Sequence, residues 1–207
     1  MKRTILALFA LATAIPAWAQ SGDQVEAPSY KPGDSWTYVR TDRFSATRNA
    51  KYVTTIKSVS DRGHETSRQA LEGTIIGSGD EYTRELNPIL FEDQRFEPYI
   101  ANYRFPLAPG KRWEGTYTFT SYGALWETTR TNRVEGWEAV KTPAGEFKAL
   151  KIVFEGSGRS RMGNLQNQFS GTTWYSPEVR RAVRTEFKSQ RPPRDERVEL
   201  VSFKPAQ

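Results

Sequence analysis

The feature that most constrains the fold of this chain is a succession of short segments that alternate polar and apolar residues, each ended by a turn signal. In residues 36–44, Trp36 and Tyr38 fall on one face of an extended strand, and Thr37 and Val39 fall on the other. Outside the first nineteen residues, no window of eleven or more residues has a sustained apolar repeat at helical spacing. The sequence therefore predicts an all-β, or β-dominated, protein.

About ten such segments follow one another along the chain. They cover residues 36–44, 51–60, 64–76, 81–86, 113–122, 126–142, 146–154, 167–175, 179–188 and 196–203. A bulge is expected near Gly136, and most of the connections are short turns such as Asp61-Arg62-Gly63. Short connections between consecutive strands favour an antiparallel meander, curled into a half-barrel or closed as a barrel.

The first nineteen residues have a different character from the rest. Two basic residues precede an apolar run that ends at Pro16, and Ala17-Trp18-Ala19 forms a small-x-small cleavage signal. This is the pattern of a secretory signal peptide, and it is too short for a permanent membrane span. We expect cleavage after residue 19, a single domain over residues 20–207, no transmembrane span after cleavage, and a periplasmic or secreted location.

Cysteine is absent from the chain. Without it the protein has no disulfide, no thiolate nucleophile and no lipid anchor of the bacterial lipoprotein kind. The low aliphatic content is offset by 11 Phe, 9 Tyr and 6 Trp. Because a chain of this length can bury a sizeable core without cross-links, we expect an ordered domain rather than a disordered one.

Residues 87–112 interrupt the strand pattern and contain Pro88, Pro98, Pro106 and Pro109. Loops of this length are usually functional or disordered, and we expect a long connection or a lid that closes the concave side of the sheet. Apolar side chains of this segment, together with tryptophans of the strands, are candidates for lining a cavity for an apolar or lipid-like ligand. These candidates are Trp36, Phe91, Phe96, Tyr99, Tyr103, Trp113, Trp126 and Trp174. Packing in the core is the alternative explanation for the tryptophans.

Four motifs combine a turn signal with a neighbouring strand. They are Pro32-Gly33-x-x-Trp36, Phe105-Pro106-Leu107-x-Pro109-Gly110-Lys111-x-Trp113, Thr142-Pro143-Ala144-Gly145-Glu146-Phe147-x-Ala149-Leu150-Lys151-Ile152, and Thr173-Trp174-Tyr175-Ser176-Pro177-Glu178-Val179. Over roughly residues 31–203, this set resembles the TapB-like group of bacterial envelope domains of unknown function. The resemblance implies a β-rich, half-barrel-like sheet similar to the bacterial lipoprotein carriers, and it implies no reaction or catalytic residues. Turn chemistry alone also explains the motifs, since proline fixes φ and glycine takes the positive-φ position of a hairpin.

The sequence offers little for catalysis. The one imidazole, His64, stands beside a predicted turn, where we expect a solvated surface residue. A single histidine without cysteine excludes the usual zinc sites, so no metal or cofactor is expected. The acidic pairs Asp80-Glu81, Glu92-Asp93 and Asp195-Glu196 point to opposite faces of a strand. A carboxylate-based hydrolase would need partners from different strands within about 10 Å.

Positive charge gathers toward the end of the chain. The formal net charge is +6, and residues 156–207 hold ten basic and five acidic side chains. Arg180, Arg184 and Lys188 fall on one face of the predicted strand 179–188. Such a face suits an anionic glycan or lipopolysaccharide phosphates, and a solvated sheet face is the alternative. Nucleic acid is not an expected partner, because export separates the protein from it.

From these features we predict a non-enzymatic exported envelope protein that holds an apolar or lipid-like ligand, or an envelope protein partner, in a concave β-sheet. The first alternative is a module that binds a glycan or lipopolysaccharide through exposed tryptophans and a basic arginine face. The second alternative is a carboxylate-based hydrolase.

Overall fold

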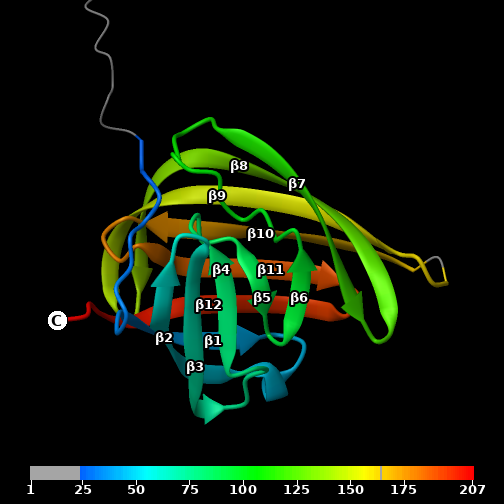
Figure 1. Cartoon of the computed structure of the whole chain (residues 1–207), viewed down its shortest axis with the longest axis horizontal. Helices are drawn as coiled ribbons and strands as arrows, with labels where there is room; N and C mark the ends of the chain where they lie inside the picture. Colours follow the sequence, from blue (N-terminus) through cyan, green and yellow to red (C-terminus); the bar gives the residue numbers. More distant parts are fainter. Residues whose placement is uncertain (1–23, 164) are drawn as a thin grey trace, which may run out of the picture.

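The structure, a computed structural model, describes residues 24–163 and 165–207, so the predicted signal segment 1–19 lies outside the described residues. Among the described residues, twelve strands and one short 3-10 helix, η1 (Ala46–Arg48), make up the regular structure (Figure 1). The strands are β1 (Ser35–Asp42), β2 (Ala50–Ser60), β3 (Gly63–Gly73), β4 (Gly79–Thr83), β5 (Pro88–Phe91), β6 (Gln94–Glu97), β7 (Arg112–Ser121), β8 (Ala124–Thr142), β9 (Gly145–Ser160), β10 (Gln166–Ser176), β11 (Arg181–Gln190) and β12 (Pro193–Lys204). The all-β fold class is confirmed.

The sheet closes into a barrel. Each strand pairs antiparallel with the next one along the chain, and β1 pairs with β12. The closing register runs from Ser35 opposite Lys204 to Asp42 opposite Glu196. The predicted antiparallel meander is confirmed, in its closed form. There are more strands than the ten predicted because β5 and β6, of four residues each, lie in the segment 87–112 that we expected to be irregular.

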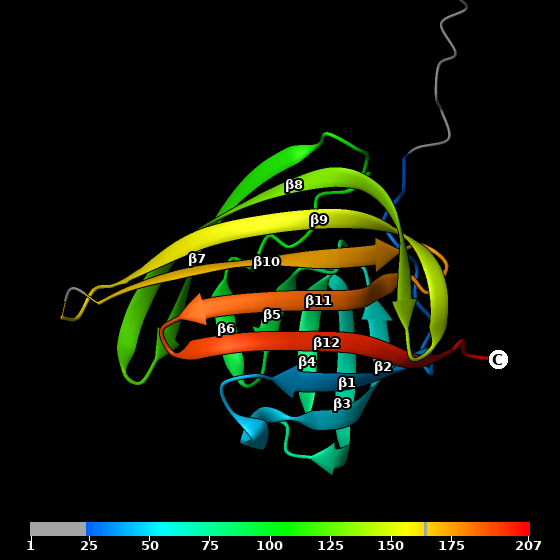
Figure 2. The same ribbon diagram turned by 180° about the vertical axis from the view of Figure 1, so that it is seen from behind.

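Alternating strand directions place the turns at two opposite ends of the barrel. The turns after β1, β3, β5, β7, β9 and β11 gather at one end, which we term the mouth, and the β9–β10 hairpin projects beyond it (Figure 1). The opposite end, the plugged end, carries the turns after the even-numbered strands. The described start of the chain and the C terminus also lie there (Figure 2).

Residues 98–111, termed the plug, cover the inner face of the sheet at the plugged end. Tyr103, Phe105 and Leu107 are buried. The rings of Tyr103 and Phe105 lie 5.6 and 5.5 Å from the ring of Tyr175 on β10. The segment that the sequence led us to expect as a lid is therefore part of the hydrophobic core.

Side-chain hydrogen bonds hold the plug to the wall of the barrel. Nδ2 of Asn87 donates to the carbonyl of Tyr103 at 3.0 Å, and Oδ1 of Asn87 accepts from the Tyr103 amide at 2.8 Å. The carbonyl of Ala101 accepts from Nε1 of Trp113 at 2.9 Å and from Nδ2 of Asn132 at 3.0 Å. Because buried polar groups need such partners, these contacts fix where the plug ends inside the barrel.

The β8–β9 hairpin bends over its neighbours at the plugged end. A register shift between Val134 and Gly136 marks the bulge that the sequence predicts near Gly136. Beyond this bulge the hairpin folds over the ends of β11 and β12 (Figure 2), where the amide of Ala144 donates to the carbonyl of Leu200 at 3.1 Å. The plugged end is thereby closed, and the mouth is the end at which a site can open.

Candidate functional site

The inner face of the barrel at the mouth is aromatic along β6, β7 and β8. Trp126 alternates along β8 with the buried side chains of Thr128 and Arg130, so it points inward. Phe119 on β7 stands opposite Trp126, and Phe96 on β6 stands opposite Phe119. The Trp126 and Phe119 ring centroids are 6.3 Å apart, and those of Phe119 and Phe96 are 5.6 Å apart. Residues directly opposite each other share a face, so all three rings line the interior.

The aromatic lining continues along β9, β10 and β11. Phe154 stands opposite Gly171, and Gly171 stands opposite Phe187. Phe169 lies two residues before Gly171 and shares its face, with its ring centroid 6.0 Å from that of Phe187. We term these inward rings the aromatic wall: Phe96, Phe119, Trp126, Phe154, Phe169 and Phe187. Phe119, Trp126, Phe169 and Phe187 are only partly buried, so solvent reaches this inner surface.

Glycines under the rings explain how the aromatic wall packs. A Cβ at Gly156 would stand 2.3 Å from Cζ of Phe169, and a Cβ at Gly171 would stand 2.4 Å from Cζ of Phe154. Because no side chain fits beneath them, these rings lie against the backbone of the neighbouring strand. The two glycines therefore make room for the rings of Phe169 and Phe154 on the inner face.

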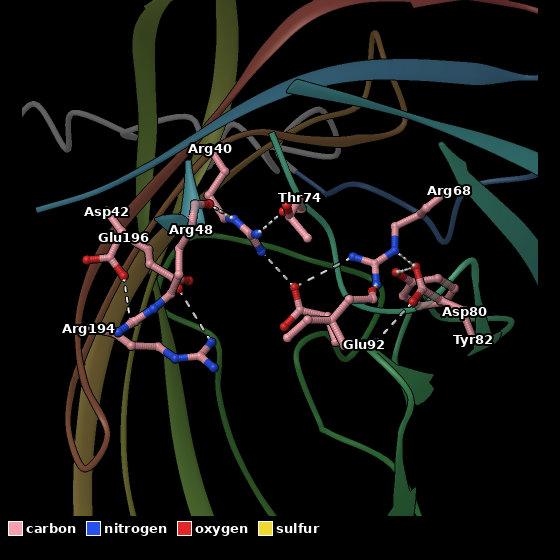
Figure 3. Close-up of polar contacts among 11 residues, drawn as sticks. Arg40, Asp42, Arg48, Arg68, Thr74, Asp80, Tyr82, Glu92, Arg194 and Glu196 are labelled. Atoms are coloured by element: carbon pink, nitrogen blue, oxygen red, sulfur yellow. Dashed lines mark hydrogen bonds and ion pairs between the residues drawn. The ribbon is translucent and has the colours of Figure 1, made fainter. Parts of the chain in front are cut away.

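Charged side chains cover the opposite wall of the mouth, from β12 through β1 to β5 (Figure 3). Arg40 contacts Glu92 at 2.8 Å, and Arg68 contacts Asp80 at 3.1 Å and Glu92 at 3.6 Å. These residues, together with two further ion pairs, form what we term the polar wall. The further pairs are Arg48–Asp42 at 3.0 Å and Arg194–Glu196 at 3.4 Å. The mouth therefore has one aromatic side and one charged side.

Asp80 and Glu92 are the carboxylates that the hydrolase alternative would use. They come from different elements, and both contact the guanidinium group of Arg68, so they are close together. The Asp80 side chain has an exposed fraction of 0%. Burial raises the pKa of Asp80, while the charge of Arg68 opposes the rise. Because arginines neutralise both carboxylates and enclose one of them, we interpret the pair as a structural ion-pair network.

Four arginines are buried among the described residues: Arg40, Arg68, Arg130 and Arg181. The first two belong to the polar wall and have carboxylate partners. Within the described part of the chain, Arg130 and Arg181 have no carboxylate at ion-pair distance. The barrel interior therefore holds two guanidinium groups that no side chain neutralises by direct contact.

Arg130 lies on the inner face of β8, beside the aromatic wall. Its guanidinium carbon is 3.6 Å from the centre of the Phe154 ring, and its Nε donates to Oδ1 of Asn132 at 2.9 Å. Burial lowers the pKa of Arg130 to about 10, so it still carries its charge at neutral pH. The ring face of Phe154 stabilises this charge in part.

Arg181 lies deeper in the barrel, among aromatic rings. Its guanidinium carbon is 4.8 Å from the centre of the Trp36 ring and 5.2 Å from that of the Tyr82 ring. Asp80 is close enough to interact with Arg181, but Arg68 already holds that carboxylate at 3.1 Å. Among the described residues, no acceptor forms a hydrogen bond with the guanidinium group of Arg181.

His64 is buried, which corrects the expectation of a solvated residue in a turn. Its ring lies between those of Tyr30 and Tyr82, at centroid distances of 4.6 and 5.1 Å. Its Nε2 has no hydrogen-bond partner within the described residues. Burial, and secondarily the charge of Arg181, lowers the pKa of His64 to about 3, so the ring is neutral at physiological pH. The turn signal failed as a guide to exposure because His64 follows the turn and points into the barrel.

Two of the eight candidate ligand residues, Phe96 and Trp126, lie on the aromatic wall. The other six pack in or against the two hydrophobic core clusters; they are Trp36, Phe91, Tyr99, Tyr103, Trp113 and Trp174. For the tryptophans among these six, the core alternative is the one that their positions favour. Sequence reasoning missed Phe119, Phe154, Phe169 and Phe187, although each stands at an alternating position of a predicted strand.

The three candidate anion-binding residues do not share one strand face. Arg180 precedes β11 in a turn with φ +59°, and its Nη2 donates to Oδ1 of Asp34 at 2.9 Å. Arg184 and Lys188 lie on the outer face of β11, but Arg184 pairs with Glu199 at 2.9 Å. The expected alignment fails because the strand begins one residue after Arg180.

A groove of about 770 Å³ crosses the outer face of β8 to β11 near the mouth. Its lining includes the amide of Gln168, the hydroxyl of Ser170 and the charged amine of Lys188. Phe44, 65% exposed, stands at this groove. The groove is thus largely polar, and the exposed ring of Phe44 is available for stacking; Phe169 also belongs to its lining.

The described residues contain neither a cluster of metal ligands nor a membrane-spanning helix. Within residues 24–163 and 165–207, no three His, Asp or Glu side chains are grouped as a metal site requires. The same residues contain no helix with the length and apolar character needed to cross a lipid bilayer.

Comparison with known proteins identifies a shared fold. No protein-family model matches the chain, and no curated protein matches it. A candidate lipoprotein from Parabacteroides distasonis is 16% identical, with a TM-score of 0.56 over 88% of this chain and 100% of that one. A candidate exported protein with a YmcC-like fold, from Bacteroides fragilis, is 16% identical, with a TM-score of 0.57 over 87% of this chain and 99% of that one. The TapB-like grouping stays a prediction.

Proposed function

We propose that this chain is a non-enzymatic exported envelope protein that holds an amphipathic, lipid-like ligand against the aromatic wall at the mouth of the barrel. One observation carries the proposal: Phe119, Trp126 and Phe169, like Phe187, point inward and are nevertheless only partly buried. Apolar surface that a fold leaves accessible in a concave position favours an apolar ligand. The polar wall across the mouth suits the polar part of the same molecule.

The proposed location is the bacterial periplasm. The signal-peptide pattern of residues 1–19 supports export. The two similar structures belong to proteins that are described as a lipoprotein and as an exported protein, which supports the same compartment. A segment of an envelope protein inserted into the mouth would use the same aromatic wall, and the experiment below separates it from a small ligand.

The absence of a reaction is part of the proposal. The two carboxylates that come together, Asp80 and Glu92, are held by Arg68. The one histidine is buried between rings, and its depressed pKa makes it a weak base. These features support a binding role over a hydrolytic one.

Quenching of tryptophan fluorescence by a brominated fatty acid tests the proposal, because bromine quenches a tryptophan that it contacts. Saturable quenching is expected in the wild-type mature protein. Trp126→Phe keeps a ring on the wall, so it is expected to keep binding and lose most of the quenching. Phe169→Ala is expected to weaken binding, whereas the control Val59→Ala, at an exposed residue near the end of β2 at the plugged end, is expected to leave it unchanged.

Two results would overturn the proposal. The first is the absence of saturable quenching at any concentration below that at which the fatty acid forms micelles. The second is saturable quenching that Trp126→Phe and Phe169→Ala leave unaltered, because the ligand would then lie elsewhere. A native preparation in which a polypeptide and no small molecule occupies the mouth, identified by mass spectrometry, would favour the envelope protein partner.

A second candidate function is binding of an acidic glycan in the outer groove. The observation in its favour is the groove of about 770 Å³ with its polar lining, the exposed Phe44 ring and the cationic Lys188. Lys188→Glu and Phe44→Ala are expected to lower retention on an immobilised acidic polysaccharide. Arg62→Glu, a charge reversal in the exposed β2–β3 turn, is the control; equal retention of all three variants and the wild type would dispose of this candidate.

A further inference from the structure

Two buried arginines remain without a counter-charge in the interior. Arg130 is 8% exposed and Arg181 is 6% exposed. A buried cation normally pairs with a carboxylate, because its desolvation is costly. The polar wall shows that this barrel can supply carboxylates, since it pairs Arg40 with Glu92. Arg130 and Arg181 have only ring faces and, for Arg130, one amide oxygen.

Both guanidinium groups lie within electrostatic range of one plug residue, Tyr103. Burial raises the pKa of Tyr103 to about 12, and the charges of Arg181 and Arg130 limit the rise, so both cations act on its hydroxyl group. Tyr103 belongs to the plug, whose position hydrogen bonds from Asn87 fix. Arg181 is the first residue of β11 and approaches the plug from the plugged end, whereas Arg130 lies beside the aromatic wall.

We propose that Arg130 and Arg181 bind the anionic group of the ligand, a carboxylate or a phosphate, at the floor of the mouth. This inference rests on the proposed function, because it assigns the polar end of the ligand that the aromatic wall would hold. The planar fork of a guanidinium group matches the geometry of both anions. Nε of Arg130 is engaged by Asn132, so its Nη groups are the donors that remain for the ligand.

The path from the aromatic wall to Arg130 is short. Arg130 stands opposite Gly156 across β8 and β9, and the ring of Phe169 covers Gly156. The guanidinium group of Arg130 also lies over the ring of Phe154, a member of the aromatic wall. A chain lying along the wall would bring its end group to Arg130 first.

His64 supplies a second polar group without a partner beside Arg181. Its Nε2 is buried and has no hydrogen-bond partner in the described part of the chain. His64 and Arg181 both contact Tyr82, whose ring centre lies 5.1 Å from the imidazole centroid and 5.2 Å from the guanidinium carbon. A neutral imidazole with its proton on Nε2 can donate to the same anion.

Matched probes that differ only in the end group test the inference. The mature protein, stripped of co-purified lipid, is titrated with oleate, with oleyl alcohol and with inorganic phosphate, and the variants are Arg130→Gln and Arg181→Gln. Wild-type protein is expected to bind oleate at least about tenfold more tightly than oleyl alcohol. A tenfold difference in affinity corresponds to the free energy of about one charge-assisted hydrogen bond. Each glutamine variant is expected to lose that preference, and Arg181→Lys is expected to keep part of it.

Arg112→Gln, at an exposed position of β7, is the control and is expected to bind oleate as the wild type does. Unfolding by urea shows whether each variant is folded before its binding is compared. If inorganic phosphate alone competes with oleate and raises the unfolding midpoint of the wild type only, the site stands and its anion is a free phosphate. If phosphate raises the unfolding midpoint of the wild type only, and neither lipid binds, the anion site is kept and the lipid-like ligand is refuted.

Equal affinity of the wild type for oleate and oleyl alcohol, unchanged in both glutamine variants, would overturn the anion site and leave the proposed lipid-binding function intact. Failure of all three probes to bind would overturn both.

Discussion

Replacement of Arg68 by methionine tests how the polar wall is stabilised. Arg68 contacts Asp80 at 3.1 Å and Glu92 at 3.6 Å, and its Nη2 donates to the carbonyl of Ile76 at 2.5 Å. Methionine has a similar length, so Arg68→Met leaves little cavity and mainly removes the charge. The variant leaves a fully enclosed carboxylate, that of Asp80, without its cation.

The expected cost follows from these contacts. Removing one partner of a buried ion pair costs about 3–5 kcal/mol, because the other charge stays buried and uncompensated. Glu92 keeps Arg40 at 2.8 Å, so the loss falls on Asp80 alone, and we expect the lower end of that range, about 3 kcal/mol. Burial already raises the pKa of Asp80, and without Arg68 the pKa rises further, so the carboxyl group can protonate. The destabilisation is therefore largest at neutral pH and shrinks as the pH falls through the raised pKa of Asp80.

Urea unfolding followed by tryptophan fluorescence measures this change in the free energy of unfolding at pH 7 and pH 5. The double variant Arg68→Met with Asp80→Asn removes the stranded charge and is expected to recover about half of the loss. The control is Arg133→Met, whose ion pair with Glu135 is exposed and is worth about 0–1 kcal/mol. If Arg68→Met unfolds within about 0.5 kcal/mol of the wild type at pH 7, or the second substitution recovers nothing, the ion-pair reasoning is refuted.

Three further outcomes follow from the interior. Arg181→Met is expected to raise the free energy of unfolding of the ligand-free protein by about 1–3 kcal/mol in urea titrations, since it removes a buried charge without a partner; a loss of similar size would mean that the ring contacts outweigh desolvation. The folded-state pKa of His64, about 3, lies below its unfolded value, so protonation favours the unfolded state as the pH falls below about 6.5. His64→Phe is expected to remove a dependence of about 1 kcal/mol per pH unit between pH 6 and 4, and parallel pH profiles of the variant and the wild type would contradict this. Gly171→Ala places a Cβ 2.1 Å from the carbonyl oxygen of Glu186 and 2.4 Å from Cζ of Phe154. We therefore expect the free energy of unfolding to fall by about 1–3 kcal/mol, measured by thermal unfolding. An unchanged midpoint would show that the aromatic wall moves to accommodate the methyl group.

Turn chemistry accounts for most of what the sequence predicts about the fold. Hairpins such as the one closed by Gly145 have a proline or glycine where φ must be fixed or positive, and they appear at the expected places. β5 and β6 escaped notice because an alternation over four residues is too short to stand out. Closure was beyond the sequence, since it depends on the register between Ser35 and Lys204, at opposite ends of the described chain.

The candidate site was harder to predict, for a reason that β11 illustrates. The alternation of Val183 and Phe187 identifies the inner face of β11, and Arg181 falls on the same face. An arginine within an apolar alternation is a signal of a buried charge, but the prediction named the outward Arg184 and Lys188 and not Arg181. On β8 no such signal exists, because the inner face there is polar over several positions, among them the one that Arg130 occupies.

The width of the barrel ties these observations together. An eight-stranded barrel is just wide enough for its own side chains to fill, and diameter grows with the number of strands, so a twelve-stranded barrel has a wider interior to fill. At the plugged end, Tyr103 and its neighbours from residues 98–111 occupy that space. At the mouth, the inward rings of Phe169 and Phe154 pack over Gly156 and Gly171, where no other side chain fits. A sequence selected for stability alone would have apolar residues at positions 130 and 181, because burying an unpaired guanidinium group destabilises the fold. An anion-binding site at the floor of the mouth gives these two buried charges a role.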